Sequence, residues 1–487
     1  MKSFQCGPYR IEQRAEHCFV VPRQGRMLTE GVIFSNEELF RAALKDGCPL
    51  QVANVAHLPG IVGPAIAMPD IHSGYGFPIG GVAAVDATDG AVSPGGVGYD
   101  INCGVRLLAS RLTRDDIAGF EDGLLDALQG AVPAGVGSSR KDLGIKADLF
   151  EACLLSGAAA AVEAGFGETT DLQQIEDQGA IAGADPGHVS NHARRRGLTQ
   201  LGTLGSGNHF VETGFVDRVY DEETAAAFGL RPSLVTVTVH TGSRGFGHQV
   251  CQDAVRDLRN APEFKALDLP DKQLCCAPIG SRRGQGYLSG MAAAANFAFA
   301  NRQIITHMVR EAFSRALRGR GRDRTLDLVY DLAHNIAKFE EHHVDGAPRR
   351  VLVHRKGATR AFPAGHRELK GTAFFERGQP VLVPGDMGRY SYVLVGQPTC
   401  GTNTFLSSAH GAGRTMSRKA ARTAVTAGRV LDALKKGGTR VRAASKSTLV
   451  EEYPEAYKDV AHVVDVLHKA GIARPVARLR PLVVIKG

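Results

Sequence analysis

Hydrophobic positions recur at two different spacings along the chain, and the spacing separates predicted strands from predicted helices. The alternating β-branched run Leu234–Val239 predicts a strand. Shorter apolar runs predict further strands at 326–332, 351–353, 381–383, 392–395 and 482–485. Apolar positions three and four residues apart predict helices at about 147–165, 249–260, 288–318, 414–436 and 455–469.

The N-terminal part of the chain has weaker periodicity. Ser35-Asn36-Glu37-Glu38 has the spacing of a capping box and predicts a short helix that stops near Gly47. A Gly-rich stretch follows at roughly 59–105, with short apolar runs between its glycines. The segment at about 185–200, with the basic run Arg194–Arg196, is predicted to be the most exposed.

Strands and helices interleave without a Pro/Ser-rich linker between them. This order predicts an α+β fold with one large domain over residues 1–487, in which helices surround short mixed strands. Three predicted strands are closely followed by a histidine, namely His240, His334 and His354. Because a strand end holds a side chain rigidly, a metal or catalytic site is expected there.

Composition limits the class of protein. The 487 residues are 43% hydrophobic and 22% charged, which is typical of a soluble globular chain and excludes collagen, coiled coils and small disulfide scaffolds. No apolar run approaches about 18 residues, so no membrane association is expected. Nine scattered cysteines, without a signal peptide, favour the reducing cytoplasm. The net charge of +8 is compatible with a polyanionic partner but decides little alone.

Five residues in four separate motifs offer metal ligands. They are Asp100, Cys103, His209, His240 and His334. One tetrahedral zinc takes at most four ligands, so five donors that include a bridging thiolate suit two cations sharing Cys103. The mixed oxygen, nitrogen and sulfur set fits Mn²⁺ or Zn²⁺, and paired cations are typical of phosphoryl chemistry.

Each motif also has an ordinary structural interpretation. An Asp near glycines is usually a turn residue, and an isolated Cys is usually a small hydrophobe. The same holds for Asp70 and His72, which lie two residues apart in a Gly-flanked segment and could face one ion. His209 could be a hydrogen-bonded surface residue at the entrance to a strand.

Two further motifs suggest phosphate binding. The loop after His240 contains Arg244, whose guanidinium together with backbone N–H groups suits an anion. His410 precedes Gly411-Ala412-Gly413-Arg414 at the expected start of a helix, where the helix N-terminus and Arg414 would hold a phosphate. His410 could then be a base, a metal ligand or a nucleophile. The chain has no P-loop and no dinucleotide-binding glycine motif.

In this order, the motifs resemble the RtcB family of GTP-dependent RNA-splicing ligases. The matching segments extend from residue 68 to the last residue, and the ordered set is far more specific than any single motif. They are Met68–Gly76, Gly96–Val105, Leu204–Glu212, His240–His248, Met291–Arg302, Asp331–Asn335, His354–Arg360, Pro384–Gly388, His410–Arg414 and Pro481–Gly487.

The resemblance implies an enzyme that joins RNA with a 3′-phosphate or 2′,3′-cyclic phosphate end to RNA with a 5′-hydroxyl end, using GTP and two Mn²⁺ ions. His410 would take GMP from GTP and pass it to the RNA 3′-phosphate, and the 5′-hydroxyl would then expel GMP. A cyclic phosphate would first be opened by metal-activated water. The family's role in tRNA splicing or RNA repair is implied too, and an activating accessory protein is possible.

The resemblance also assigns individual residues. Cys103 would bridge the ions, with Asp100 and His209 on one and His240 and His334 on the other. Arg244, Arg414 and Arg418 would face the RNA phosphate. The guanylate pocket would comprise Asn208, His209, Phe210, Val211, Glu212, His334, Asn335, Pro384, Gly385, Asp386, Met387, Ser391, His410, Gly411, Ala412, Gly413, Tyr457 and Lys486.

One position departs from the family pattern, and two other functions remain open. Asp386 stands where the family turn usually has Ser, so its carboxylate could accept a guanine N–H or repel a phosphate. The alternatives are a dinuclear metal phosphoesterase or nuclease with His410 as acid or base, and an RNA-binding protein with a structural metal. The basic run Arg194–Arg196 either guides RNA or is an ordinary solvated loop.

Overall fold

The computed structural model describes residues 2–140, 143–319, 323–400 and 404–487, and two eight-stranded sheets form its frame. In the first sheet neighbouring strands are antiparallel except for the parallel pair β4–β5. Its order is β1 (Ser3–Cys6), β2 (Tyr9–Ala15), β3 (Cys18–Val21), β4 (Gly31–Phe34), β5 (Ile61–His72), β6 (Ile79–Asp86), β14 (Ala347–Lys356) and β13 (Asn335–Val344).

The second sheet combines strands from the middle and the end of the chain. Its order is β12 (Leu326–Ala333), β8 (Gly104–Thr113), β10 (Leu234–Thr241), β9 (Phe210–Val219), β20 (Ala473–Lys486), β17 (Ser391–Gly396) and β16 (Pro380–Val383). A short strand, β19 (Arg440–Ala443), pairs in parallel with β20. Every residue of β10 is buried, as expected for a central strand covered on both faces.

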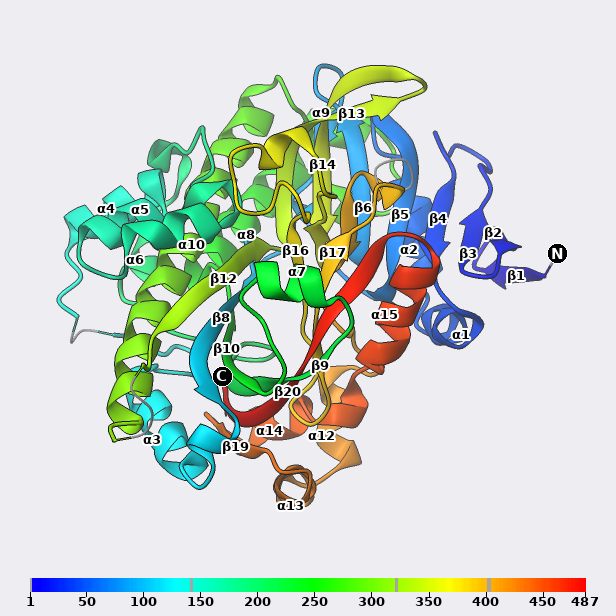
Figure 1. Cartoon of the computed structure of the whole chain (residues 1–487). Helices are drawn as coiled ribbons and strands as arrows, with labels where there is room; N and C mark the ends of the chain where they lie inside the picture. Colours follow the sequence, from blue (N-terminus) through cyan, green and yellow to red (C-terminus); the bar gives the residue numbers. More distant parts are fainter. Residues whose placement is uncertain (1, 141–142, 320–322, 401–403) are drawn as a thin grey trace.

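Helices surround this frame (Figure 1). The 35-residue helix α10 (Arg282–Ala316) packs against α3, α4, α5 and α8 on one side of the molecule, and the first strands lie on the opposite side (Figure 1). The other α-helices within the described residues are α1 (Glu37–Lys45), α2 (Cys48–Val55), α3 (Glu121–Ala131), α4 (Ala147–Ser156), α5 (Ala158–Glu163), α6 (Asn191–Leu198), α7 (Glu222–Ala227), α8 (Arg244–Asn260), α9 (Pro262–Ala266), α12 (Arg418–Ala424), α13 (Ala427–Lys436), α14 (Lys446–Glu451) and α15 (Val460–Lys469).

The two short sheets are β7 (Ala91–Val92) with β11 (Ala277–Pro278), and β15 (Ala358–Arg360) with β18 (Ser407–Ala409). One cluster of buried side chains joins residues from Cys6 to Ile485, which supports the single domain expected from the sequence. In the described part of the chain, no helix combines the length and apolar character needed to cross a membrane.

The α+β class is confirmed, and all six predicted strands are present with longer bounds. The helix expected at 147–165 is divided at Gly157 into α4 and α5. The Gly-rich stretch at 59–105 contains the long strands β5 and β6, which its irregular spacing did not predict. The segment at 185–200 includes helix α6, whose Arg194 binds Glu151 and is half-buried.

Two predictions about helix starts are wrong. The N-cap of α1 is Asn36, whose side chain accepts a hydrogen bond from the Leu39 N–H at 2.8 Å, while Ser35 is fully buried one residue earlier. The helix expected from 414 begins only at Arg418, and His410 instead follows strand β18. The helix N-terminus expected beside His410 is therefore displaced to Arg418.

Three fully buried charges join the second sheet to helix α10. Asp331 of β12 accepts hydrogen bonds from Arg106 of β8 at 2.8 Å and from Arg302 of α10 at 2.9 Å. Arg302 also donates to the backbone oxygens of Asn102 at 2.8 Å and Thr241 at 3.0 Å. Asn102 directly precedes Cys103, and Thr241 directly follows His240. Arg302 therefore positions the backbone beside both of these side chains.

We expect Asp331→Asn to destabilise the protein by about 3–5 kcal/mol, because it leaves two buried guanidinium groups without a counter-charge. Asp327→Asn on the same strand is the matched control, since Asp327 pairs with Arg111 at the surface and its side chain is 49% exposed. Asp327→Asn should lower the free energy of unfolding by less than about 1 kcal/mol. Urea unfolding followed by circular dichroism measures both, and equal losses would contradict the buried network.

Candidate active site

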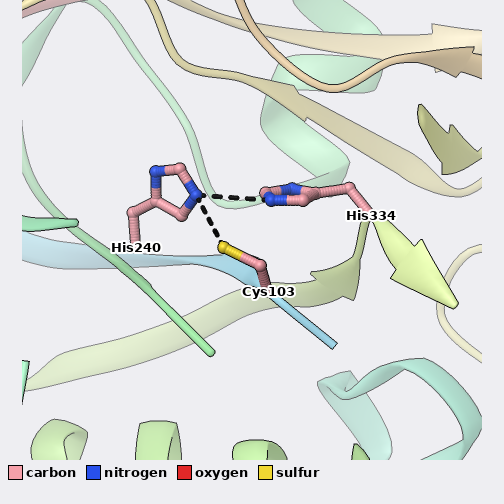
Figure 2. A group of neighbouring side chains, drawn as sticks. All are labelled: Cys103, His240 and His334. Atoms are coloured by element: carbon pink, nitrogen blue, oxygen red, sulfur yellow. Dashed lines mark hydrogen bonds between the residues drawn. The ribbon is translucent and has the colours of Figure 1, made fainter. Parts of the chain in front are cut away.

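Five side chains converge at one end of the second sheet. Two groups of three share Cys103, namely Asp100, Cys103 and His209, and Cys103, His240 and His334. Within each group the potential ligand atoms lie within 4.8 Å of one another. The Cys103 Sγ is 3.4 Å from the Nε2 atoms of both His209 and His240. Figure 2 shows Cys103, His240 and His334 pointing toward a common centre.

Strand register explains this convergence. Cys103 immediately precedes β8, and Val105 of β8 lies opposite His240 of β10 on one side and Leu332 of β12 on the other. His334 follows the end of β12. On the far side of β10, Phe210 of β9 lies opposite His240, so the preceding residue His209 reaches the same edge. Of the three histidines predicted to follow strands, only His334 does. His240 lies within β10 but still reaches the cluster, whereas His354 lies within β14, accepts from the Ser93 N–H and does not line the cavity.

Burial favours the neutral forms of His240, His334 and Cys103. Desolvation, with repulsion from His334 and His209, lowers the pKa of His240 well below its usual value. Desolvation and the Asp100 carboxylate raise the pKa of the Cys103 thiol. Neutral imidazoles are the form that binds metals, while a thiolate here needs an adjacent positive charge, which a divalent cation supplies. The donor set therefore fits two cations that share the sulfur.

His209 shows the second hydrogen bond that is typical of a metal-ligating imidazole. Its Nδ1 lies 3.0 Å from the Leu204 carbonyl oxygen, and its Nε2 lies 2.8 Å from Asp100 Oδ2. Gly205 has a positive φ of 98°, and a Cβ there would lie 2.4 Å from the His209 Nδ1. The glycine thus makes room for the protein's own imidazole.

His410 lies beside this cluster and is held by a residue of the first sheet. Its Nδ1 donates a hydrogen bond to Asp70 Oδ2 at 2.6 Å, and its backbone N–H donates to the same oxygen at 3.2 Å. Because a carboxylate only accepts, Nδ1 carries the proton, so the lone pair of the neutral ring is on Nε2. The His410 and His334 ring centroids are 4.9 Å apart.

A cavity of about 500 Å³ contains the donor cluster and His410. It is also lined by residues from the C-terminal part of the chain, among them Glu452, Tyr457 and Lys486. The last residues of β20 thereby contribute to the same cavity as the start of β8. The cavity is large enough for a small ligand.

Charged groups at the C-terminal side of the cavity are buried together. Burial opposes ionisation of Glu452, but Lys486 and Arg414 outweigh it and lower the pKa of this carboxyl. Glu452 accepts hydrogen bonds from Arg414 Nη1 at 3.1 Å and from the Tyr457 hydroxyl. Lys486 Nζ is 3.6 Å from Glu452 and lies over the Phe210 ring, 5.2 Å from its centroid.

The structure brings most of the predicted site residues to this cavity. Those that line it are Asp100, Cys103, Asn208, His209, Phe210, Glu212, His240, His334, Asn335, Pro384, Gly385, Asp386, Met387, Ser391, His410, Gly411, Ala412, Gly413, Arg414, Arg418, Tyr457 and Lys486. The Arg418 side chain is 56% exposed, with its Nε 3.8 Å from Glu451 and Glu452, so it has freedom to reach a ligand.

Two predicted residues lie outside the cavity lining. Val211 is fully buried within strand β9. Arg244 donates from Nε to Thr203 Oγ1 at 3.0 Å and from Nη2 to Ser138 Oγ at 3.0 Å. It also has a positive φ of 55°, and α8 begins at this residue. In this conformation Arg244 holds neighbouring loops together, and its contact with RNA stays a prediction.

Asp386 is oriented toward its own turn. Its Oδ1 accepts from the Gly388 and Arg389 N–H groups at 2.9 and 3.1 Å, and its Oδ2 pairs with Arg389 at 2.5 Å. The sequence left open whether the Asp386 carboxylate would repel a phosphate. Arg389 offsets the negative charge of Asp386, so this arrangement weakens that repulsion.

Sequence reasoning missed the roles of Asp70 and Glu452. Asp70 was considered as a metal ligand next to His72, but its carboxylate instead binds His410, which lies 340 residues later. Glu452 directly follows helix α14 and belongs to no recognisable motif. Asp70 is recognisable in the sequence only as an acidic residue in a Gly-rich stretch. This position does not indicate that His410 is its partner.

Comparison with known proteins gives consistent matches. The family model for tRNA-splicing ligase RtcB matches residues 51–487. The tRNA-splicing ligase RtcB of Thermococcus kodakarensis is 51% identical over 462 residues, covering 95% of each chain. That of Methanococcus maripaludis is 47% identical over 481 residues, covering 98% of each chain. The RNA-splicing ligase RtcB of Mycobacterium tuberculosis is 49% identical over 440 residues, covering 90% of this chain and 100% of the relative.

We expect Cys103→Ala to reduce the bound divalent metal from about two ions per chain to fewer than about 0.5, because both three-donor groups lose their shared sulfur. Asp100→Ala should lose one ion, since Asp100 belongs to one group only. Cys18→Ala, a free cysteine on β3, serves as the control. Elemental analysis after gel filtration gives the stoichiometry, and two ions retained by Cys103→Ala would exclude the shared thiolate.

Stability should fall as pH rises from about 4.5 to about 8, because of Glu212. Burial raises the pKa of this carboxyl to about 8 against the attraction of Lys486, with Asp386 adding to the rise. The folded protein therefore binds a proton that the unfolded chain releases near pH 4.5, and this contribution is lost on ionisation. Glu212→Gln should unfold a few degrees higher than wild type at pH 8.5 and at a similar temperature at pH 5.

The control for this effect is Glu222→Gln, at an exposed position of α7. Differential scanning calorimetry at several pH values measures each melting temperature. A Glu212→Gln difference that is the same at pH 5 and pH 8.5 would show that Glu212 does not titrate in this range.

Proposed function

This chain belongs to the RtcB family of RNA ligases, and we propose that it joins RNA ending in a 3′-phosphate or 2′,3′-cyclic phosphate to RNA with a 5′-hydroxyl end, consuming GTP and requiring two Mn²⁺ ions. The family match over residues 51–487 supports the ligase class. The single observation that carries the proposed mechanism is the Asp70–His410 hydrogen bond beside the five-donor cluster.

His410 is the proposed nucleophile. Its Nε2 attacks the α-phosphorus of GTP, a P–N bond forms, and pyrophosphate leaves with the electron pair of the broken P–O bond. Asp70 holds the proton on Nδ1, which selects the tautomer whose Nε2 carries the lone pair and fixes the ring. It also offsets the positive charge that develops on the imidazole after attack. Asp70 thus acts as a positioning residue.

The buried C-terminal side of the cavity is the proposed guanylate pocket. Glu212, Tyr457 and Lys486 offer hydrogen-bonding groups, and Phe210 offers an aromatic face within the same lining. The two Mn²⁺ ions, held by the donor groups that share Cys103, would neutralise phosphate charge and polarise phosphorus. The surrounding apolar strands exclude water and strengthen these interactions.

Sealing follows in two transfers. An RNA 3′-phosphate oxygen attacks the phosphorus of His410-bound GMP, which breaks the P–N bond and frees the imidazole. The RNA 5′-hydroxyl then attacks the activated 3′-phosphate, and GMP leaves while the hydroxyl proton passes to solvent. A cyclic end is first hydrolysed to the 3′-phosphate. Arg414 and Arg418 lie at the cavity and carry the charge needed to hold that phosphate.

Incubation with α-³²P-GTP and Mn²⁺ tests the covalent step. We expect label on the wild-type protein that survives alkali and is lost in acid, as a phosphoramidate should behave. His410→Ala should lower the labelling at least about 1,000-fold, since it removes the attacking nitrogen. His462→Ala, a histidine of α15 that lies outside the cavity lining, should label as wild type does.

The same experiment separates the ligase from a dinuclear phosphoesterase. A protein that hydrolyses a cyclic phosphate end but takes no label would favour the phosphoesterase. Undiminished labelling of His410→Ala would place the nucleophile elsewhere.

A further inference from the structure

The segment His354–Arg360 is one of the sequence motifs described above, yet the proposed function assigns it no role. Its first three residues end strand β14, in which successive side chains point to opposite faces of the sheet. His354 and Lys356 are hydrogen-bonded to the backbone of the Gly-rich stretch at 59–105. Arg355 lies between them and has its contacts elsewhere, in the segment that leads to His410.

The Arg355 guanidinium is fully buried and joins two parts of the first sheet to that segment. Its Nη2 donates to the Phe405 carbonyl oxygen at 2.9 Å, and its Nε donates to Ser407 Oγ at 2.8 Å. On its other side, Nη2 is 2.9 Å from Oε2 of Glu340 in β13. Burial opposes ionisation of Glu340, but the charge of Arg355 outweighs it and lowers the pKa of this carboxyl. The ion pair therefore fixes the direction of the guanidinium.

The backbone that Arg355 holds is strained. Phe405 and Leu406 are consecutive residues with positive φ, at 49° and 51°, and both are buried. Large side chains rarely adopt this conformation, which persists only where the surroundings enforce it. Arg355 holds the carbonyl of the first strained residue, and the Ala361 N–H donates to the carbonyl of the second at 2.7 Å. Strained turns of this kind are typical of functional sites.

The strained turn leads directly into β18 and then to His410. β18 has three residues and pairs with β15. β15 in turn is attached to the metal cluster, since the Ala358 N–H donates to the His334 carbonyl oxygen at 3.2 Å. At Gly357, just before β15, a Cβ would lie 3.0 Å from Cε1 of His410. The backbone that carries His410 therefore lies in a narrow space, and its direction is set by the turn that precedes it.

We propose that Arg355 is a positioning residue for His410, because it holds the Phe405–Leu406 turn and so sets the direction in which β18 presents the imidazole. Asp70 fixes the rotation of the ring, whereas Arg355 fixes the backbone from which the ring extends. Without the Arg355 contacts, the turn relaxes to ordinary backbone angles and Nε2 of His410 moves away from the line of attack. This assignment rests on the proposed function, from which it takes the attack by His410.

Arg355→Lys tests the role in single-turnover labelling of the Mn²⁺-loaded protein by α-³²P-GTP. Lysine keeps the charge beside Glu340 but lacks the planar fork that reaches Phe405 and Ser407 together. The rate constant at saturating GTP should fall at least about 20-fold, since a displacement of about 1 Å can cost about 100-fold. The GTP concentration that gives half the maximal rate should stay within about twofold, because uniform binding is unchanged.

The matched control is Arg350→Lys on the same strand, where the exposed guanidinium lies over the Phe339 ring, 5.1 Å from its centroid. This variant should label at the wild-type rate. A higher GTP requirement for Arg355→Lys, with an unchanged rate at saturation, would assign Arg355 to nucleotide binding and overturn the proposal.

Ser407→Ala removes one acceptor of Arg355 and gives a second test if Arg355→Lys does not fold. It should slow labelling about fivefold in the wild-type protein but less than about twofold in Arg355→Lys, because both changes remove the same contact. Ser408→Ala is its control, since in the described part of the chain the buried Ser408 hydroxyl has no hydrogen-bond partner. Losses that simply add in the double variant would contradict a shared contact.

Proton NMR of the ¹⁵N-histidine-labelled protein without GTP follows the position of His410 independently of the reaction. The Nδ1–H resonance, identified by its absence from His410→Ala, should lie far downfield because the 2.6 Å hydrogen bond to Asp70 is short and charge-assisted. Arg355→Lys should shift or broaden this resonance, and Arg350→Lys should not. An unchanged resonance and labelling rate in Arg355→Lys would overturn the proposal. A wild-type protein that takes no label would instead reject the ligase mechanism, while the NMR comparison would still decide whether Arg355 positions His410.

Discussion

The contact on which the rest of the site depends is the buried interaction of Asp331 with Arg106 and Arg302. Removing three charges from water is costly, and this cost is offset only while every hydrogen bond is made. Arg302 therefore connects helix α10 to the backbone of Asn102 and Thr241 in one fixed geometry. Asn102 has a positive φ of 51°, so the loop that carries Cys103 turns sharply where Arg302 holds it.

Antiparallel strand pairing brings the candidate metal ligands together. Cys103, His209, His240 and His334 are separated by up to 231 residues in sequence, yet three adjacent strand pairs bring them to one edge of the second sheet. A shift of register by one residue would turn His240 to the opposite face of its strand. The same burial that lowers the pKa of His240 and His334 raises that of Cys103, so a thiolate there depends on a neighbouring cation.

The active-site cavity lies where distant parts of the chain meet. His410 follows the short strand β18, its partner Asp70 belongs to β5 of the first sheet, and Lys486 is in the last strand of the second sheet. The cavity therefore requires both sheets at once, which is consistent with one domain.

The sequence by itself determined the residue types and the local elements. Alternating β-branched residues predicted β10, and the set of oxygen, nitrogen and sulfur donors predicted paired cations. It did not determine the Asp70–His410 hydrogen bond or the pairing of Asp386 with Arg389. Nor did it determine the hydrogen bonds that Arg244 donates to Thr203 and Ser138. It also placed a helix at His410, where the structure has a strand end. Periodicity and donor chemistry are local properties, whereas partners hundreds of residues apart are decided by strand register and packing, which only the tertiary structure contains.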